Sequence, residues 1–319
     1  MQKRRLGTNG PEVAPIVLGG NVYGWTLDEA GSFNQFDRAL AAGLNCIDTA
    51  DMYSNWVPGH KGGESEVIIG DWMAKTGNRN KVFIATKLGL PMGEGKSGLS
   101  TRYVAEAVEA SLRRLQTDYI DLYQAHTDDS KTPMEETLGA FDRLVKAGKV
   151  RFIGASNHSG ARLAEALEVS RNNSLATYVS LQPHYNLVER QKFEADQLPV
   201  VQKYGIGVIP YYSLAAGFLS GKYTRAGAAT QSPRAGGVEK YRNARGYAAV
   251  DALVDVAYQH RSKPATVALA WLMAQPGITA PIASATNDAQ LDDLIAAAEL
   301  QLDKASVQRL NEVSSPGAS

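Results

Sequence analysis

The chain has 319 residues, with 33 basic and 33 acidic side chains, a formal net charge of zero and an apolar fraction of 44%. Because it has no excess or block of positive charge, an electrostatic grip on nucleic acid or an anionic membrane surface is excluded. No apolar run approaches the roughly 20 residues that cross a bilayer. This length suits two ordinary domains or one α/β barrel. We expect a small molecule or another protein as the partner.

The N-terminus and the cysteine content bear on the compartment. The basic start MQKRRLG leads into Thr8, Asn9, Gly10 and Pro11 instead of an apolar stretch, so we expect no secretory signal peptide. Cys46 is the sole cysteine, and it can form neither an internal disulfide nor a thiolate metal site. We therefore expect a cytoplasmic protein without a metal centre, in which Cys46 is a small buried apolar residue.

Short apolar runs alternate with longer amphipathic stretches up to about residue 295. The runs are too short for helices and predict strands at 16–20, 45–48, 82–87, 119–126, 152–156, 179–184, 208–212 and 280–283. Helical periodicity marks 104–115 and 134–147. Thr132 is expected to cap the second of these helices, with Pro133 at its first position and Gly148 at its end.

Eight strand–helix alternations without period-two patterning predict a parallel sheet covered on both faces. No GxGxxG follows the first strand, which disfavours a Rossmann domain. The sequence therefore predicts a (β/α)8 TIM barrel, as a single domain over residues 1–319. Residues 215–246 are rich in glycine and lack clear periodicity, which predicts a long loop or lid after the seventh strand, on the face where barrels keep their active sites.

Polar residues stand at the ends of three predicted strands. Asp48 ends the second, Lys87 the third and His126 the fourth, and Tyr53 follows Asp48 by five positions. A free phenol titrates near ~10, so a tyrosine that protonates an alkoxide at neutral pH benefits from a nearby cation. Lys87 can supply that cation and Asp48 can hold it. Each residue alone has a structural alternative, namely an ion pair, a buried imidazole or a loop aromatic. Their joint position favours catalysis.

Ser156 and Asn157 end the fifth strand, Gln182 lies in the sixth, and Tyr212 ends the seventh. Amide groups suit a carboxamide, and a tyrosine face suits a flat heteroaromatic ring. Alternatively, Ser156 and Asn157 cap the helix that begins near residue 159, and Tyr212 is a packing residue.

Several motifs resemble those of the aldo-keto reductases. They are IDTADMY, FIATKLG, YIDLYQAH, GKVRFIGASN, LQPHYN and YYSLAAGFLSGKY, in order from about residue 3 to residue 300. The last motif is most similar to the branch that includes potassium-channel β-subunits and many bacterial reductases. The resemblance implies a barrel that binds NADP(H) and reduces small carbonyl substrates.

By this resemblance Tyr53 is the general acid, Lys87 its partner, Asp48 the anchor of that lysine, and His126 the residue that orients the substrate. Ser156, Asn157 and Gln182 would hold the nicotinamide carboxamide, with Tyr212 against the ring. Further cofactor contacts are implied for Gly20, Asn21, Val22, Ser213, Leu214, Gly217, Leu219, Lys222, Ser284, Thr286 and Gln290.

The residues that the resemblance places near the adenosine of the cofactor depart from the family pattern. Residues 282–294 contain Asp288, Asp292 and Asp293 but no Lys or Arg that could pair with a 2′-phosphate. Leu294 stands where an asparagine often meets the adenine. NAD(H) use therefore stays open beside NADP(H), and an arginine of the 215–246 segment is a possible source of the missing charge.

Substrate contacts are expected from Tyr23, Trp25 and Trp56, which follow the first two strands. These aromatic residues can form apolar walls for a carbonyl substrate or serve as lid packing. Two other functions compete with carbonyl reduction. One is a cofactor-loaded sensor or regulatory subunit, and the other is a Schiff-base enzyme that uses Lys87 as nucleophile, which Asp48 disfavours by keeping the amine protonated.

Overall fold

The computed structural model describes residues 1–223 and 235–317. Its main sheet has eight parallel strands in the order β10-β3-β4-β5-β6-β7-β8-β9. All eight predicted strands are confirmed. Their bounds are Val17–Gly19 (β3), Cys46–Asp48 (β4), Phe83–Leu88 (β5), Ile120–Ala125 (β6), Val150–Ser156 (β7), Tyr178–Gln182 (β8), Gly207–Val208 (β9) and Ile282–Ala283 (β10).

Backbone hydrogen bonds connect the two ends of this strand order, β9 and β10. Thr279 N–H donates to the Val208 carbonyl over 2.8 Å, and Ile282 N–H donates to the Pro210 carbonyl over 2.9 Å. These bonds link the segment before β10 to β9, so the sheet curls into a barrel. The predicted (β/α)8 TIM barrel is therefore confirmed.

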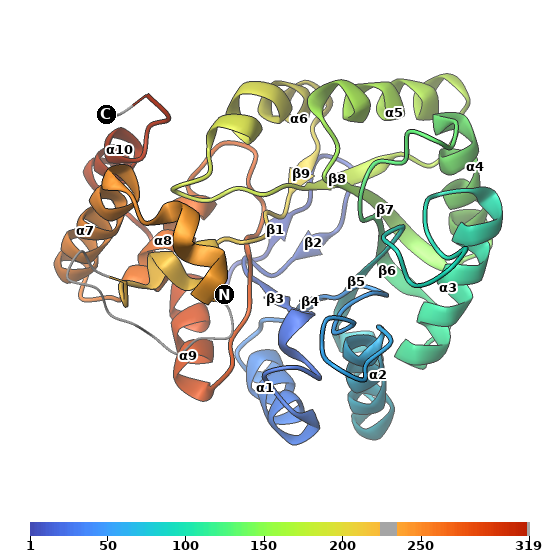
Figure 1. Cartoon of the computed structure of the whole chain (residues 1–319), viewed down its shortest axis with the longest axis horizontal. Coiled ribbons are helices and arrows are strands. Elements are labelled where there is room, and N and C mark those ends of the chain that lie inside the picture. Colours follow the sequence, from blue (N-terminus) through green and yellow to red (C-terminus); the bar gives the residue numbers. More distant parts are fainter. Residues whose placement is uncertain (224–234, 318–319) are drawn as a thin grey trace.

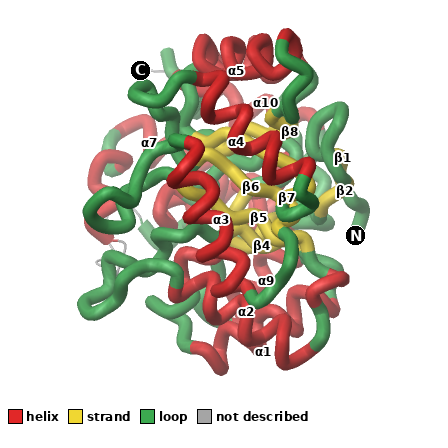
Figure 2. Tube along the Cα trace, turned by 90° about the vertical axis from the view of Figure 1, so that its right-hand side faces the viewer, coloured by secondary structure: helices red, strands yellow, loops and turns green. Residues whose placement is uncertain are grey.

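Helices surround the strands on the outside (Figures 1 and 2). Their bounds are Glu29–Ala41 (α1), Glu64–Thr76 (α2), Thr101–Leu115 (α3), Met134–Lys146 (α4), Gly160–Asn172 (α5), Leu198–Tyr204 (α6), Ala244–Gln259 (α7), Pro264–Met273 (α8), Asp288–Ala297 (α9) and Lys304–Val313 (α10). In α4 the predicted apolar stripe is buried through Leu138, Phe141 and Leu144. These residues are each three positions apart, close to one helical turn, which places the stripe against the strands.

The predicted N-terminal cap of α4 is wrong. Pro133 occupies the cap position itself and makes no side-chain cap, while Thr132 Oγ1 donates to Asp129 Oδ2 over 2.7 Å. The Thr132 hydroxyl therefore binds the carboxylate of Asp129 instead of capping the helix. At the other end Gly148 adopts a φ of 72° and closes the helix as predicted.

A short antiparallel hairpin, β1 (Arg4–Arg5) with β2 (Glu12–Val13), precedes the barrel. Figure 1 shows it across the centre of the ring of strands. Gly7 in its turn has a φ of 68°, and a Cβ there would lie 2.6 Å from the Gly205 carbonyl oxygen. The hairpin thus packs against the residues just before β9 and closes the end of the barrel where the strands begin.

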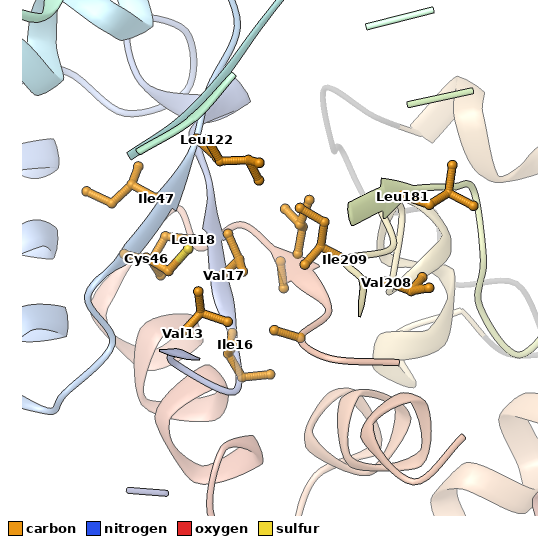
Figure 3. Packing of buried hydrophobic residues seen from close by; sticks show 14 of the residues in the cluster. Val13, Ile16, Val17, Leu18, Cys46, Ile47, Leu122, Leu181, Val208 and Ile209 are labelled. Atoms are coloured by element: carbon orange, nitrogen blue, oxygen red, sulfur yellow. The ribbon is translucent and has the colours of Figure 1, made fainter. Parts of the chain in front are cut away.

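Apolar side chains from several strands pack into one core, including Val17 and Leu18 of β3, Leu122 of β6 and Leu181 of β8 (Figure 3). Cys46 of β4 is buried in the same core as a free thiol, as predicted. Within the described residues no helix is long and apolar enough to span a membrane.

The segment after β9 is more regular than the predicted loop 215–246. Ala215–Ser220 is a 3-10 segment with a kink at Ala216 and Gly217, Ala235–Tyr241 is a 3-10 helix, and α7 already begins at Ala244. Asn243 caps α7 by accepting the Gly246 N–H, which is why the helix starts before the expected end of the loop. Residues 224–234 of the expected lid lie outside the described residues.

Candidate active site

A cavity of about 650 Å³ opens at the carboxyl ends of the strands. Residues that end strands line it, among them Gly19 of β3, Asp48 of β4, Ser156 of β7 and Gln182 of β8. Of the residues predicted from the sequence, those at its wall are Asn21, Asp48, Tyr53, Trp56, His126, Ser156, Asn157, Gln182, Tyr212, Ser213, Leu214, Gly217, Lys222, Ser284, Thr286 and Gln290.

Asp48 and Lys87 form a fully buried ion pair beneath the cavity. Lys87 Nζ donates to Asp48 Oδ2 over 2.6 Å and to the Thr49 carbonyl over 2.7 Å. Burial lowers the pKa of the Lys87 ammonium, and the Asp48 carboxylate opposes that change through its charge and its hydrogen bond. The pair arises because β4 and β5 are neighbours in the barrel.

Two amides hold the second oxygen of Asp48. Gln182 Nε2 donates to Asp48 Oδ1 over 2.8 Å, and Gln124 Nε2 donates to the same oxygen over 3.2 Å. Gln124 was missed in the sequence analysis. It stands two residues before His126, and residues at this spacing in a strand point to the same face, so the alternation of β6 could have indicated it.

Tyr53 lies close to Lys87. The Lys87 ammonium is 4.8 Å from the centre of the Tyr53 ring. The ring of His126 lies edge to face with that of Tyr53, with 6.1 Å between the ring centres. The structure therefore brings all four residues of the predicted catalytic set together, three at the cavity wall and Lys87 directly behind them.

His126 is almost entirely buried, and its Nδ1 has no hydrogen-bond partner among the described residues. Burial and the nearby Lys87 charge hold the pKa of the imidazole well below 6.5. At neutral pH the ring is therefore uncharged, with one nitrogen as donor and the other as acceptor.

Ser156 and Asn157 do not cap α5, because Ser159 caps it by accepting the Arg162 N–H. Asn157 Nδ2 instead donates to the His126 carbonyl over 2.9 Å, and its Oδ1 accepts the Tyr211 hydroxyl over 2.8 Å. The capping alternative is thus wrong. Asn157, with a φ of 58°, connects the ends of β6, β7 and β9 at the wall of the cavity.

The segment after β9 forms another wall. Tyr212 is 51% exposed and lines the cavity, so the alternative that it is a buried packing residue is wrong. Tyr212, Ala215, Ala216 and Gly217 all have positive φ angles, a strained arrangement that concentrates at functional sites. A Cβ on Gly217 would lie 3.3 Å from Lys222 Nζ, so the glycine leaves room for the ammonium beside the backbone.

Several predicted contact residues do not reach the cavity. Gly20 and Val22 belong to a buried 3-10 helix, and Leu219 is fully buried. Tyr23 is also fully buried, and its hydroxyl donates to Gln35 Oε1 over 3.0 Å, so it is a packing residue and not a substrate wall.

The two predicted tryptophans are adjacent but differ in position. Trp56 is exposed at the cavity wall, 6.0 Å from Tyr53 between ring centres. Trp25 lies edge to face against Trp56 at 5.7 Å and lines a neighbouring hollow instead.

The negative charge expected after β10 is partly offset by residues from elsewhere in the chain, because two cations, Arg38 and Lys263, pair with the three aspartates. Arg38 of α1 pairs with Asp288 over 2.7 Å and with Asp292 over 2.6 Å, away from the cavity wall. Asp293 lines the cavity, and Lys263 pairs with it over 2.6 Å. Lys263 was not among the residues predicted from the sequence; the fold brings it to the cavity wall from the start of α8.

Among the described residues, the arginines of the 215–246 segment do not supply the positive charge that would pair with a 2′-phosphate. Arg242 pairs with Glu239, and Arg245 donates to the Val188 carbonyl. Arg225 and Arg234 lie outside the described residues.

The cavity fits a nicotinamide dinucleotide. Its volume lies within the range of about 300–1,000 Å³ typical of cofactor sites. It offers an exposed aromatic face at Tyr212, an ammonium at Lys222 beside the backbone of Gly217, and neutral polar groups at Asn157 and Thr286. These groups match a flat ring, a diphosphate and a ribose in their chemistry. No group of three or more metal-ligating side chains occurs in the described ranges.

The fold and this site define a (β/α)8 barrel with a polar cavity at the carboxyl ends of its strands. A model of the aldo/keto reductase family matches residues 15–315, so the chain belongs to that family. It is an oxidoreductase by this membership.

Relatives span nearly the whole chain. An uncharacterized oxidoreductase of Bacillus subtilis, YrpG, is 37% identical over 98% of this chain and 96% of its own. A probable voltage-gated potassium channel β-subunit of rice is 32% identical over 91% and 89%. Versiconal hemiacetal acetate reductase of Aspergillus parasiticus is 30% identical over 100% and 98%. The predicted resemblance, including the potassium-channel branch, is confirmed.

Proposed function

We propose that the protein is an NAD(P)H-dependent reductase of small aldehydes and ketones, with Tyr53 as the proton donor. The observation that carries this proposal is that the Lys87 ammonium binds the Asp48 carboxylate and lies 4.8 Å from the centre of the Tyr53 ring, and that Asp48 and Tyr53 both line a cavity of cofactor size. The name of the Aspergillus relative, a reductase, supports the same chemistry.

A nicotinamide cofactor held in this cavity would supply a hydride to the carbonyl carbon, and the protein supplies the proton. As the carbon–oxygen double bond becomes a single bond, the oxygen gains negative charge. Tyr53 transfers its hydroxyl proton to that oxygen, which completes the alcohol. The Lys87 charge favours this transfer because a cation beside a phenol stabilises the phenolate that remains. Asp48 holds the ammonium in place through a bond of 2.6 Å.

His126 donates a second hydrogen bond to the substrate oxygen in this proposal. Its low pKa keeps the ring neutral, so it polarises and orients the carbonyl without delivering a charge. Asn157 binds the His126 carbonyl and so fixes the position of the residue. Preorganised donors of this kind stabilise developing charge at little reorganisation cost.

We assign the nicotinamide end of the cofactor to Asn157, Ser156, Gln182 and the exposed face of Tyr212. Gln182 also holds Asp48, so it connects this end to the catalytic ion pair. The diphosphate would lie near Gly217 and Lys222, and the adenosine near Ser284, Thr286 and Gln290. Asn21 accepts the Ser284 hydroxyl over 2.7 Å, which links β10 to the segment after β3.

The substrate end of the cavity is aromatic and uncharged. Trp56, Tyr53 and the neutral His126 line it. Among the described residues the cations at the cavity wall are Lys222 and Lys263, both from the segments assigned to the cofactor. This distribution favours a neutral, apolar carbonyl compound over a phosphorylated or acidic one.

Neither of the two competing functions, a Schiff-base enzyme and a regulatory subunit, gains support. Lys87 has no exposed surface and donates to both Asp48 and the Thr49 carbonyl, so its amine is unsuited to attack a carbonyl carbon. Similarity to a potassium-channel β-subunit does not by itself favour a regulatory role, because the same chain holds the complete acid–base set.

The proposal is tested by following the oxidation of NADPH and NADH at 340 nm with a panel of aliphatic and aromatic aldehydes and ketones. We expect turnover with several neutral carbonyl compounds and the corresponding alcohol as product. Failure to oxidise both dinucleotides with every compound would reject the proposal. Covalent trapping by borohydride would instead support the Schiff-base alternative.

A further inference from the structure

The Lys263–Asp293 pair lines the cavity together with Ser284, Thr286 and Gln290, the residues assigned above to the adenosine. Lys263 precedes α8, and Asp293 lies in α9, with 2.6 Å between Nζ and Oδ1. Both residues line the same cavity as Tyr53 and His126. Because the nicotinamide is assigned to the catalytic end, the other end of an extended dinucleotide would reach this pair.

The charges at this pair leave room for an anion. Asp288 and Asp292 share Arg38 and do not line the cavity. Asp293 does line it, and its charge balances that of Lys263, so the pair is formally neutral. The ammonium has three N–H donors, and its side chain is 61% exposed, so it can turn toward a ligand while it stays near Asp293.

We propose that Lys263 is the residue that recognises the 2′-phosphate of NADP(H), and that Asp293 is its counter-ion when that phosphate is absent. This inference rests on the proposed function. A 2′-phosphate carries close to two negative charges and competes for the ammonium more strongly than one carboxylate. NAD(H) brings a neutral hydroxyl to this place and leaves the Lys263–Asp293 pair intact. Lys263 therefore determines which dinucleotide binds more tightly.

A purely structural role for the pair is the competing explanation. Thr266 Oγ1 also donates to the Asp293 carbonyl over 3.2 Å, so α8 and α9 are already joined beside the pair. If Lys263 served only to join these helices, its loss would change stability and affect the two dinucleotides equally. The ratio of the two affinities separates the roles.

The test measures dissociation constants for NADPH and NADH by quenching of tryptophan fluorescence in the full-length protein, without substrate. In Lys263→Gln we expect NADPH to bind about tenfold more weakly, the size of one charge-assisted contact, while NADH changes less than about twofold. Lys263→Arg should keep the preference. Asp293→Asn should tighten NADPH a few-fold, because the ammonium is no longer shared.

Lys222→Gln is the matched control. Lys222 is the other described cation at the cavity wall, and both dinucleotides have the diphosphate that it would contact. We expect this variant to weaken both to a similar extent. Equal changes in both dinucleotides for Lys263→Gln, or no change, would overturn the inference and leave the proposed function standing. If the unmodified protein bound neither dinucleotide, both proposals would fall.

A second readout uses fragments of the cofactor. Binding of 2′,5′-ADP and of 5′-ADP is measured by calorimetry, which does not involve the catalytic residues. We expect 2′,5′-ADP to bind more tightly to the unmodified protein and to lose that advantage in Lys263→Gln. An advantage that persists in the variant would contradict the assignment of Lys263.

Discussion

The ammonium of Lys87 lies 4.8 Å from the centre of the Tyr53 ring while it donates to Asp48 over 2.6 Å. The charge beside the phenol is therefore held in one position by a partner whose side chain is only 1% exposed. Desolvated charge pairs interact more strongly than exposed ones, but each member depends on the other. This dependence leads to the first prediction.

Replacing Lys87 by methionine should abolish most activity and also destabilise the protein. The change removes the cation beside Tyr53 and leaves the Asp48 carboxylate buried without its partner, at a cost of about 3–5 kcal/mol. The free energy of unfolding is measured in urea, and turnover in the dinucleotide assay. The double variant Asp48→Asn, Lys87→Met should recover much of the stability and none of the activity. Recovery of activity in the double variant would show that the pair has only a structural role.

His126 should remain neutral across the physiological range. Burial and the Lys87 charge hold the pKa of its ring well below 6.5. The ring-proton resonances of His126, assigned by comparison with His126→Gln, should therefore show no titration between pH 5.5 and 8. A titration midpoint near 6.5 would contradict both the neutral state and the donor role that depends on it.

Asp51 should make stability depend on pH. Burial and the nearby Glu66 raise the pKa of its carboxyl to about 8, although the charges of Arg114 and Lys87 oppose the shift. In the unfolded chain the value is about 3.9. Between these two values the folded state binds more protons, so the free energy of unfolding falls as pH rises from about 4 to 8.

The variant Asp51→Asn lacks this titration. Its free energy of unfolding, relative to the unmodified protein, should therefore be more favourable at pH 8 than at pH 5. Asp129→Asn is the control. Although burial opposes it, hydrogen bonds from Thr132 and from backbone N–H groups lower the pKa of Asp129, so this residue is charged throughout that range. Its replacement should cost the same at both pH values. A pH-independent difference for Asp51→Asn would contradict the prediction.

The barrel and the catalytic set were predictable from the sequence because both depend on local patterns. The eight strands are short apolar runs, and parallel strands of a barrel end on one rim, so Asp48, Lys87 and His126 had to meet there. The pairing of Asp48 with Gln124 and Gln182 needs the register of separate strands, which no local pattern contains.

The residues assigned to the adenosine of the cofactor show most clearly what could not be predicted from the sequence. Local sequence gives three aspartates and no cation, yet Arg38 and Lys263 reach these aspartates from α1 and from the start of α8. The pairs form only when α9 packs between those helices. Tyr23 was placed at the substrate because it follows a strand, but its bond to Gln35 of α1 holds it in the core.

The most direct test of the proposed mechanism is a single-turnover measurement of NADPH oxidation with Tyr53→Phe, beside titration of the cofactor. The variant keeps the ring and removes the hydroxyl group that carries the transferable proton. We predict a dissociation constant within about twofold of the unmodified protein and a rate of carbonyl reduction lower by at least about 100-fold. A rate equal to that of the unmodified protein would contradict the assignment of Tyr53 as the proton donor.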